Sequence, residues 1–367
     1  MAARPRPRPR RGGRRGRDRR PWAPPRGAYR PARSEAASRL VCCGAVSGIG
    51  LVLGGGGVTG AAFHFGVLLA LRLATGWEPN EADVIVGTSS GAFVGAMVRG
   101  GKLDVDSMIG DNESREAAAA WLQRQVYPRA RPGGVGRWVT KSLLPALRRP
   151  TINVVLGSPG VYTTRGIEEW MQARLGPLAE SWPPRPTVVV AYDLEARARV
   201  PFGTDAAPEV PLRRAVAASS AVPVVYEPVE IEGRWYVDGG VASGTNADLV
   251  LLHPEPLDLV VVVAPLAATD PRRGRRFYED VLDRLGRNAL GTELEAIRRA
   301  WPDTDLLVLR PDERVLDVSR PNPMSTSATI PTFLATLRSM RDELGDPVTW
   351  RLLERHLPTL DGAAPAG

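Results

Sequence analysis

The sequence predicts an α/β protein whose mainly parallel central sheet is sandwiched by helices, built as one large domain. Three observations predict this class: short continuous apolar segments typical of buried strands, helical segments that alternate with them, and glycine-rich turns that join a strand to the next helix. The chain has 367 residues and is 43% hydrophobic, which is enough to bury a full core. A mostly disordered chain is therefore excluded.

The first half of the pattern is the most regular. Ile49–Leu53 is predicted as a strand, followed by a glycine loop and an apolar helix over residues 61–73 that ends near Gly76. A buried strand over residues 83–86 leads into a turn of small residues and a helix over 92–98. The remaining predicted elements are helices over 113–126 and 164–175, a strand over 187–192, a helix over 212–220, a hairpin of 229–231 with 234–237, a strand over 257–264, a helix over 277–299, a strand over 305–309, and helices over 332–344 and 348–356.

The net charge of +8 comes from the N-terminus. Residues 1–33 hold 13 arginines and one acid, so the rest of the chain is mildly acidic. Residues 1–40 are predicted to be a disordered tail rich in arginine, proline and glycine. The tail is either a polyanion-binding arm, a solvated segment without a partner, or translated sequence upstream of the true start. The chain has 46 arginines and only 2 lysines, which indicates a biased base composition of the gene and favours the last two of these interpretations. Nucleic acid is therefore not an expected partner.

Several protein classes are excluded by composition. The longest uninterrupted apolar run, residues 259–266, is shorter than the roughly 18 residues of a membrane span. Cys42 and Cys43 are adjacent, which excludes a disulfide framework and favours a reducing compartment; we expect cytoplasmic residence. With three histidines in all, no zinc cluster is expected, and we expect neither a metal nor another cofactor.

A run of glycines forms the first chemical motif, residues 54–60. Such a run indicates a backbone that requires positive φ, close approach of a ligand, or several N–H groups converging at a helix N-terminus, which makes an anion or oxyanion site. Gly55, Gly57 and Gly60 also fit the spacing of a dinucleotide fingerprint. The end of the second strand holds Gly87-Thr88, however, where a dinucleotide fold presents an acid.

Two further motifs hold a serine and a carboxylate. Gly87-Thr88-Ser89-Ser90-Gly91 lies between a strand and a helix, as a nucleophile elbow requires. A tight turn in which a serine only caps the helix would have the same sequence pattern. Asp238-Gly239-Gly240 follows the hairpin strand and by itself is no more than a common turn. Together, a serine, a carboxylate and an oxyanion loop supply the parts of a covalent acyl-transfer site.

These elements in this order resemble the patatin-like phospholipases, over about residues 49–250. Besides the three motifs, the resemblance includes residues 215–223 and 246–248. It implies a patatin-like catalytic domain over residues 45–270, with residues 271–367 as a helical part that completes the same domain. It also implies a lipid ester substrate and no cofactor; oligomeric state is not predicted.

The resemblance further implies a Ser–Asp dyad without a catalytic histidine. Ser89 would attack the ester, and Asp238 would take its proton. The loop would supply the oxyanion hole, chiefly through the N–H groups of Gly56, Gly57 and Val58, with Gly55 and Gly60 as its other members. Gly87 and Gly91 would shape the elbow, and Gly239 and Gly240 the turn after Asp238. The family usually has a basic residue where this chain has Thr59, so phospholipid preference is in question.

Alternatives from other classes remain at this stage. A Ser–Asp–His esterase would use His253 or His356, which both follow Asp238 in the chain. A Rossmann-like dinucleotide-binding protein would use the glycine loop. The basic amphipathic stretch over residues 137–149 would contact a membrane surface transiently, cap the active site or simply pack on the sheet, and Pro145 within it favours packing.

Overall fold

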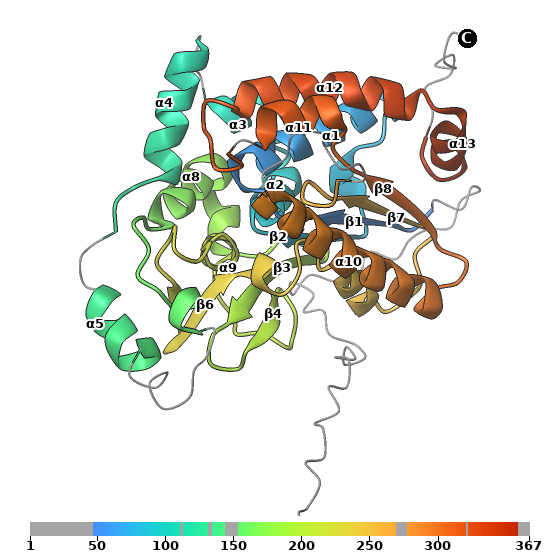
Figure 1. Ribbon diagram of the computed structural model, residues 1–367. Helices are drawn as coiled ribbons and strands as arrows, with labels where there is room; N and C mark the ends of the chain where they lie inside the picture. The colour runs from blue at the N-terminus through green and yellow to red at the C-terminus, as the bar shows by residue number, and fades with distance from the viewer. Residues whose placement is uncertain are drawn as a thin grey trace, which may run out of the picture.

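A mixed sheet of eight strands runs through the molecule with helices on both faces (Figure 1). The computed structural model describes residues 47–358 except 111, 113, 131–133, 144–152, 269–276 and 321. The tail predicted over residues 1–40 lies outside the described residues, as does much of the stretch over 137–149. The strands are β1 (Ile49–Leu53), β2 (Val84–Thr88), β3 (Thr187–Asp193), β4 (Ala198–Phe202), β5 (Val229–Ile231), β6 (Arg234–Asp238), β7 (Leu259–Val263) and β8 (Asp305–Leu309).

The strand order is β5-β6-β3-β2-β1-β7-β8, with β4 paired to β3. Strands β3, β2, β1, β7 and β8 are parallel, whereas β4, β5 and β6 are antiparallel to their neighbours. This confirms the predicted mainly parallel sheet. Every residue of β1, β2 and β7 is buried, which explains why these strands read as continuous apolar runs.

Helices cover the two faces of the sheet. One face, with Leu51 and Ile85, packs against α1 (Gly57–Thr75), α2 (Ser90–Arg99) and α12 (Thr329–Leu344). The other face, with Val52 and Val262, packs against η5 (Ala247–Leu252) and α10 (Phe277–Ala300). The other helical segments are η1 (Pro79–Glu81), α3 (Val105–Ile109), α4 (Arg115–Val126), α5 (Gly134–Trp138), η2 (Val139–Leu143), α7 (Asn153–Leu156), α8 (Arg165–Leu175), η3 (Gly176–Glu180), α9 (Leu212–Ser219), η4 (Gly239–Val241), α11 (Glu313–Ser319) and α13 (Pro347–His356).

Strand β4 was not predicted. It contains Ala198 and Pro201, residue types that are depleted in strands. Proline is tolerated there because β4 is an edge strand that pairs only with β3 in the described sheet. Helix α1 also begins at Gly57, four residues earlier than predicted, so the second half of the glycine loop is the first turn of a helix.

Helix α1 departs from the expectation that no segment has the length of a membrane span. Within the described residues, α1 is the one helix that is long and apolar enough to cross a membrane. The sequence expectation counted only uninterrupted apolar runs, whereas the helix continues through His64 and Arg72. Of its most apolar window, 56% is buried inside the protein, and it packs along α12. A helix buried in a protein core satisfies the same criterion.

Candidate active site

Ser89 lies in a strained turn between β2 and α2. Its backbone has φ 54° and ψ −121°, a conformation that non-glycine residues rarely adopt. The flanking glycines allow the turn: a Cβ on Gly87 would lie 2.6 Å from Ala92 Cα, and one on Gly91 would lie 2.0 Å from the Leu53 carbonyl oxygen. The turn therefore has the close backbone contacts and the strained serine of a nucleophile elbow.

A buried hydroxyl supports the strained serine. The Ser89 N–H donates to Ser219 Oγ at 2.9 Å, and Ser219 Oγ donates to the Val190 carbonyl at 2.6 Å. Ser219 is fully buried at the end of α9. It was not assigned a role from sequence, although the signal lay in residues 215–223, which carry part of the family resemblance.

Asp238 ends β6 with its carboxylate buried. Its side chain accepts a hydrogen bond from the Ser89 hydroxyl and one of 2.7 Å from the Gly240 N–H. Burial raises the pKa of Asp238 to about 6, and these two hydrogen bonds limit the rise. Both residues are nearly closed to solvent, with 6% of Ser89 and 5% of Asp238 exposed. The structure thus brings together the two residues predicted as a pair.

The sheet register explains why this pair meets. On β3, Val190 pairs with Thr88 at the end of β2, and the next residue, Ala191, pairs with Asp238 at the end of β6. Because β4 occupies the other edge of β3 along both pairings, β2 and β6 share one edge and meet end to end. Gly239 allows the end of β6 to lie this close to β3, since a Cβ at Gly239 would lie 2.2 Å from the Val190 carbonyl oxygen.

The glycine loop presents free backbone donors beside Ser89. Some N–H groups of the loop are engaged: that of Gly55 donates to the Gly244 carbonyl at 2.7 Å, and that of Gly60 donates to the Gly56 carbonyl at 3.0 Å. No acceptor within the described part of the chain is found for the N–H groups of the three residues between them, Gly56, Gly57 and Val58. Gly55 instead contributes its small size, because a Cβ there would lie 3.3 Å from Ser89 Cβ.

His64 supports the same loop from within the core. Its Nε2 hydrogen-bonds the Gly54 carbonyl at 2.6 Å, and complete burial lowers its pKa to about 4. A neutral imidazole therefore donates to the carbonyl and holds the start of the loop. Thr59 also fixes the loop, since its N–H donates to the Pro323 carbonyl at 3.0 Å.

A pocket with mostly apolar walls opens beside Ser89. It encloses about 640 Å³ of empty space, its open mouth included. Apart from backbone and hydroxyl groups close to Ser89, its walls are aliphatic, aromatic and thioether side chains, among them Phe65, Phe93, Met108, Ile167, Trp170 and Met324. Gly57 and Val58 line the pocket together with Ser89, so two of the three residues with free N–H groups border the same space as the hydroxyl.

The two histidines of the triad alternative lie elsewhere. His356 hydrogen-bonds Asp305 at 2.7 Å. Asp305 begins β8, so it lies at the amino ends of the parallel strands, whereas Ser89 lies at their carboxyl ends. His253 hydrogen-bonds the Glu255 carbonyl in the segment that leads into β7. Across the part of the chain that the structure describes, no group of three or more histidine, cysteine or acidic side chains could hold a metal ion.

The fold and the site are those of an α/β protein with a serine and an aspartate paired at the carboxyl edge of its sheet. A family model described as patatin-like phospholipase matches residues 51–251, more than half of the chain. The chain therefore belongs to the patatin-like phospholipase family. Membership suggests a lipid acyl hydrolase and favours that reading over a dinucleotide-binding protein.

Similarities to individual proteins are found both in sequence and in structure. Uncharacterized NTE family proteins of Mycobacterium bovis and of two strains of Mycobacterium tuberculosis are each 30% identical over 213 residues, covering 55% of this chain and 48% of the relative. The chain thus spans about half the length of these curated relatives. The match to the crystal structure of VipD from Legionella pneumophila covers 81% of this chain and 67% of that chain, at 13% identity and a TM-score of 0.36.

Proposed function

We propose that this protein is a serine acyl hydrolase that cleaves lipid esters through a dyad of Ser89 and Asp238. The observation that carries the proposal is the hydrogen bond from the Ser89 hydroxyl to the buried Asp238 carboxylate. Free N–H groups and an apolar pocket beside the same hydroxyl support it. Each part has a distinct task in the reaction.

In the acylation step, Ser89 Oγ forms a bond to the ester carbonyl carbon as its proton passes to Asp238. The carbonyl oxygen becomes an oxyanion, and the N–H groups of Gly56, Gly57 and Val58 stabilise it. The tetrahedral intermediate then collapses, the bond to the alcohol oxygen breaks, and the alcohol leaves with the proton held by Asp238. The product is an acyl ester on Ser89.

In the deacylation step, Asp238 takes a proton from water as the water oxygen bonds to the acyl carbon. The same N–H groups stabilise the second oxyanion, and the proton returns to Ser89 Oγ as the fatty acid leaves. The raised pKa of Asp238 suits this task, because a base with a pKa near 6 accepts protons more readily than an ordinary aspartate and still ionises at neutral pH.

The pocket supports an acyl chain as the part of the substrate that is bound beside Ser89. A fatty acyl chain gains about 0.8 kcal/mol for each methylene that it buries. Walls such as Phe93, Ile167 and Trp170 offer an apolar surface for this burial. A charged head group would find no matching cation among the side chains that line the pocket.

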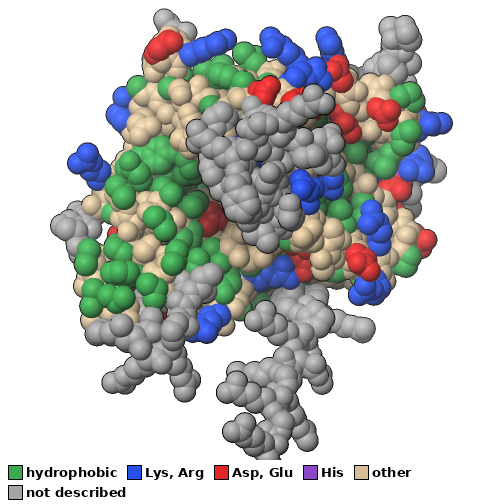
Figure 2. All heavy atoms as spheres, in the orientation of Figure 1, with side chains coloured by type: hydrophobic (Ala, Val, Ile, Leu, Met, Phe, Trp, Pro, Cys, Tyr) green, Lys and Arg blue, Asp and Glu red, His purple; other side chains and the backbone are tan. Residues whose placement is uncertain are grey.

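We further propose transient contact with a lipid surface beside the pocket. Val161 and Val224 are 62% and 56% exposed, and they adjoin Tyr162 and Tyr226, which are paired by a bridge; Tyr226 lines the pocket. On the face shown in Figure 2, hydrophobic side chains gather over the side of the molecule that carries α8. The variant with Val161→Asp and Val224→Asp should bind phosphatidylcholine vesicles more weakly and still hydrolyse a soluble short-chain ester.

Cytoplasmic residence also remains our proposal, testable by fractionation of the source cells.

Covalent labelling tests the reaction class directly. A fluorophosphonate probe should modify Ser89 stoichiometrically and abolish hydrolysis of p-nitrophenyl esters. Ser89→Ala should lose both labelling and activity, while Ser181→Ala, at an exposed serine, should keep both. A Ser89→Ala protein that still turns over ester, or a probe attached to a different residue, would refute the proposal.

A further inference from the structure

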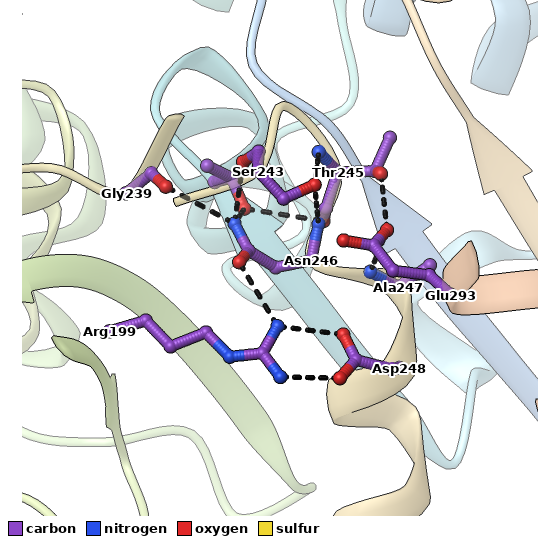
Figure 3. A network of polar contacts seen from close by, with 9 residues as sticks. Arg199, Gly239, Ser243, Thr245, Asn246, Ala247, Asp248 and Glu293 are labelled. Atoms are coloured by element: carbon purple, nitrogen blue, oxygen red, sulfur yellow. Dashed lines mark hydrogen bonds and ion pairs between the residues drawn. The ribbon is translucent and has the colours of Figure 1, made fainter. Parts of the chain in front are cut away.

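One turn, residues 243–247, contacts all three motifs, and we call it the bracing turn. Figure 3 shows four of its residues, Ser243, Thr245, Asn246 and Ala247, together with Gly239 of the third motif. The Gly244 carbonyl accepts the N–H of Gly55 at 2.7 Å, which ties the turn to the glycine loop. The Thr245 carbonyl accepts the hydroxyl of Thr88 at 3.3 Å, which ties it to the residue before Ser89. The position of the turn therefore bears on both the loop and the elbow.

Asn246 at the centre of the turn joins the elbow to the strand end that carries Asp238. Its Nδ2 donates to Thr88 Oγ1 at 3.1 Å and to the Gly239 carbonyl at 3.4 Å, besides the Ser243 carbonyl at 2.8 Å. Asn246 is fully buried and adopts a left-handed conformation with φ 51°. One amide group thus bonds both to the residue before Ser89 and to the residue after Asp238.

An ion pair outside the turn orients this amide. Arg199 Nη1 donates to Asn246 Oδ1 at 3.3 Å, so the oxygen of the amide faces β4 and its nitrogen faces the motifs. The Arg199 guanidinium also forms a two-pronged pair with the Asp248 carboxylate (Figure 3). A bidentate pair fixes a guanidinium plane, which in turn fixes the orientation of the amide that it contacts.

Glu293 of α10 anchors the turn from the opposite side. Its Oε2 accepts the Thr245 hydroxyl at 2.6 Å and the Ala247 N–H at 2.9 Å, and its carboxyl also hydrogen-bonds the Ser243 side chain. Only 7% of Glu293 is exposed. A carboxylate buried at this depth is costly unless donors surround it, and here every one of these donors belongs to the bracing turn.

We propose that Glu293 is a positioning residue for the active site, acting through the bracing turn to hold the glycine loop, Ser89 and Asp238 at their mutual distances. It does not line the pocket, so it acts without touching substrate. It also lies outside residues 51–251, the part of the chain that matches the family model. The C-terminal segment therefore completes the site as well as the core. This inference rests on the proposed function.

The test compares Glu293→Gln with Glu295→Gln in the full chain. Glutamine keeps the size of Glu293 but replaces one acceptor oxygen by an NH2 group, which cannot accept from the turn. Glu295 lies on the same helix with 70% of its side chain exposed, which makes it a matched control. Active sites are counted by fluorophosphonate titration, so that kcat and KM for a p-nitrophenyl ester refer to folded, labelled enzyme.

We expect Glu293→Gln to lower kcat per active site at least tenfold and to slow labelling in parallel, with KM changed less than twofold and Glu295→Gln unchanged. A purely structural role would lower the yield or Tm and leave kcat per site intact, and that result would overturn the inference. If Glu293→Gln does not fold, Thr245→Val removes one donor to the carboxylate and should lower kcat in the same direction; wild-type kcat in that variant would also overturn it.

Failure of this inference is separable from failure of the proposed function. Wild-type enzyme that is active and labelled at Ser89, combined with an unaltered kcat per site in Glu293→Gln, refutes only the positioning role. Wild-type enzyme that is not labelled at Ser89 refutes the proposed function, and the positioning role falls with it.

Discussion

The Ser89 hydroxyl hydrogen-bonds the Asp238 carboxylate because β2 and β6 end against consecutive residues of β3. Strand β2 runs parallel to β3 and β6 antiparallel, so their carboxyl ends face one another along one edge. A parallel strand in place of β6 would present its amino end to Ser89. The antiparallel hairpin is therefore what delivers the carboxylate, and it does so directly, without a histidine between the two side chains.

Replacing Asp238 by asparagine should abolish hydrolysis and stabilise the protein at neutral pH. The pKa of this acid rises from 3.8 in the unfolded chain to about 6 in the folded protein, so the folded state favours the protonated form. Stability from this group is fully present below pH 3.8 and is lost as pH rises through about 6. At about 1.4 kcal/mol for each pKa unit, the loss is about 3 kcal/mol at pH 7.

Urea unfolding of wild type and Asp238→Asn at several pH values measures this effect. The asparagine variant should be more stable at pH 7 by about this amount, and the difference should vanish below pH 4. Other acids titrate equally in both proteins and cancel in the comparison. A variant less stable than wild type at pH 7 would show that the Asp238 carboxylate is not strained by burial.

The pH dependence of catalysis should report the same group. A base acts only when ionised, so kcat/KM should rise tenfold per pH unit at low pH and level off above about pH 6. His64 is not the source of such an inflection, since burial lowers its pKa to about 4. Initial rates between pH 4.5 and 8, corrected for spontaneous hydrolysis, test this, and a plateau already reached at pH 4.5 would contradict it.

The sequence was informative where the signal is local. A buried strand followed by small residues and a helix is visible in a few consecutive positions, and that pattern located β1, β2 and the elbow around Ser89. The family resemblance supplied the pairing of Ser89 with Asp238, which composition and periodicity alone left open. Local sequence patterns were therefore enough to predict most strands of the parallel part of the sheet.

What the sequence did not predict depends on partners far apart in the chain. Glu293 belongs to an amphipathic helix in which glutamate normally faces water, and only the packing of α10 against η5 buries it. In the same way, the N–H group of Gly55 is engaged only because the fold places the Gly244 carbonyl beside it. The role of Arg199 was also missed, because it lies in β4, and the residues of β4 do not form a pattern that predicts a strand.

Gly57→Ala should damage catalysis more than it damages folding. Gly57 has φ +66°, and a Cβ there would lie 2.7 Å from the Pro323 carbonyl oxygen, so the loop must shift and misdirect its N–H donors. Loss of one oxyanion donor typically costs about 100- to 1,000-fold in kcat. Gly101→Ala is the matched control: Gly101 has φ +67° but faces open space, so it should lose about 1–2 kcal/mol of stability without losing kcat. Equal kcat losses in the two variants would exclude a specific role for Gly57.

Narrowing the pocket should change the chain-length preference. Ala61 lines the pocket, and Ala61→Leu adds about three carbon atoms to its wall, which excludes a similar number of substrate methylenes. At about 0.8 kcal/mol each, this should lower kcat/KM for p-nitrophenyl laurate by about thirtyfold or more relative to p-nitrophenyl acetate. Ala300→Leu, on the exposed end of α10, should keep the wild-type ratio. An unchanged laurate-to-acetate ratio in Ala61→Leu would mean that the acyl chain is bound outside this pocket, since a chain inside it must meet the added side chain.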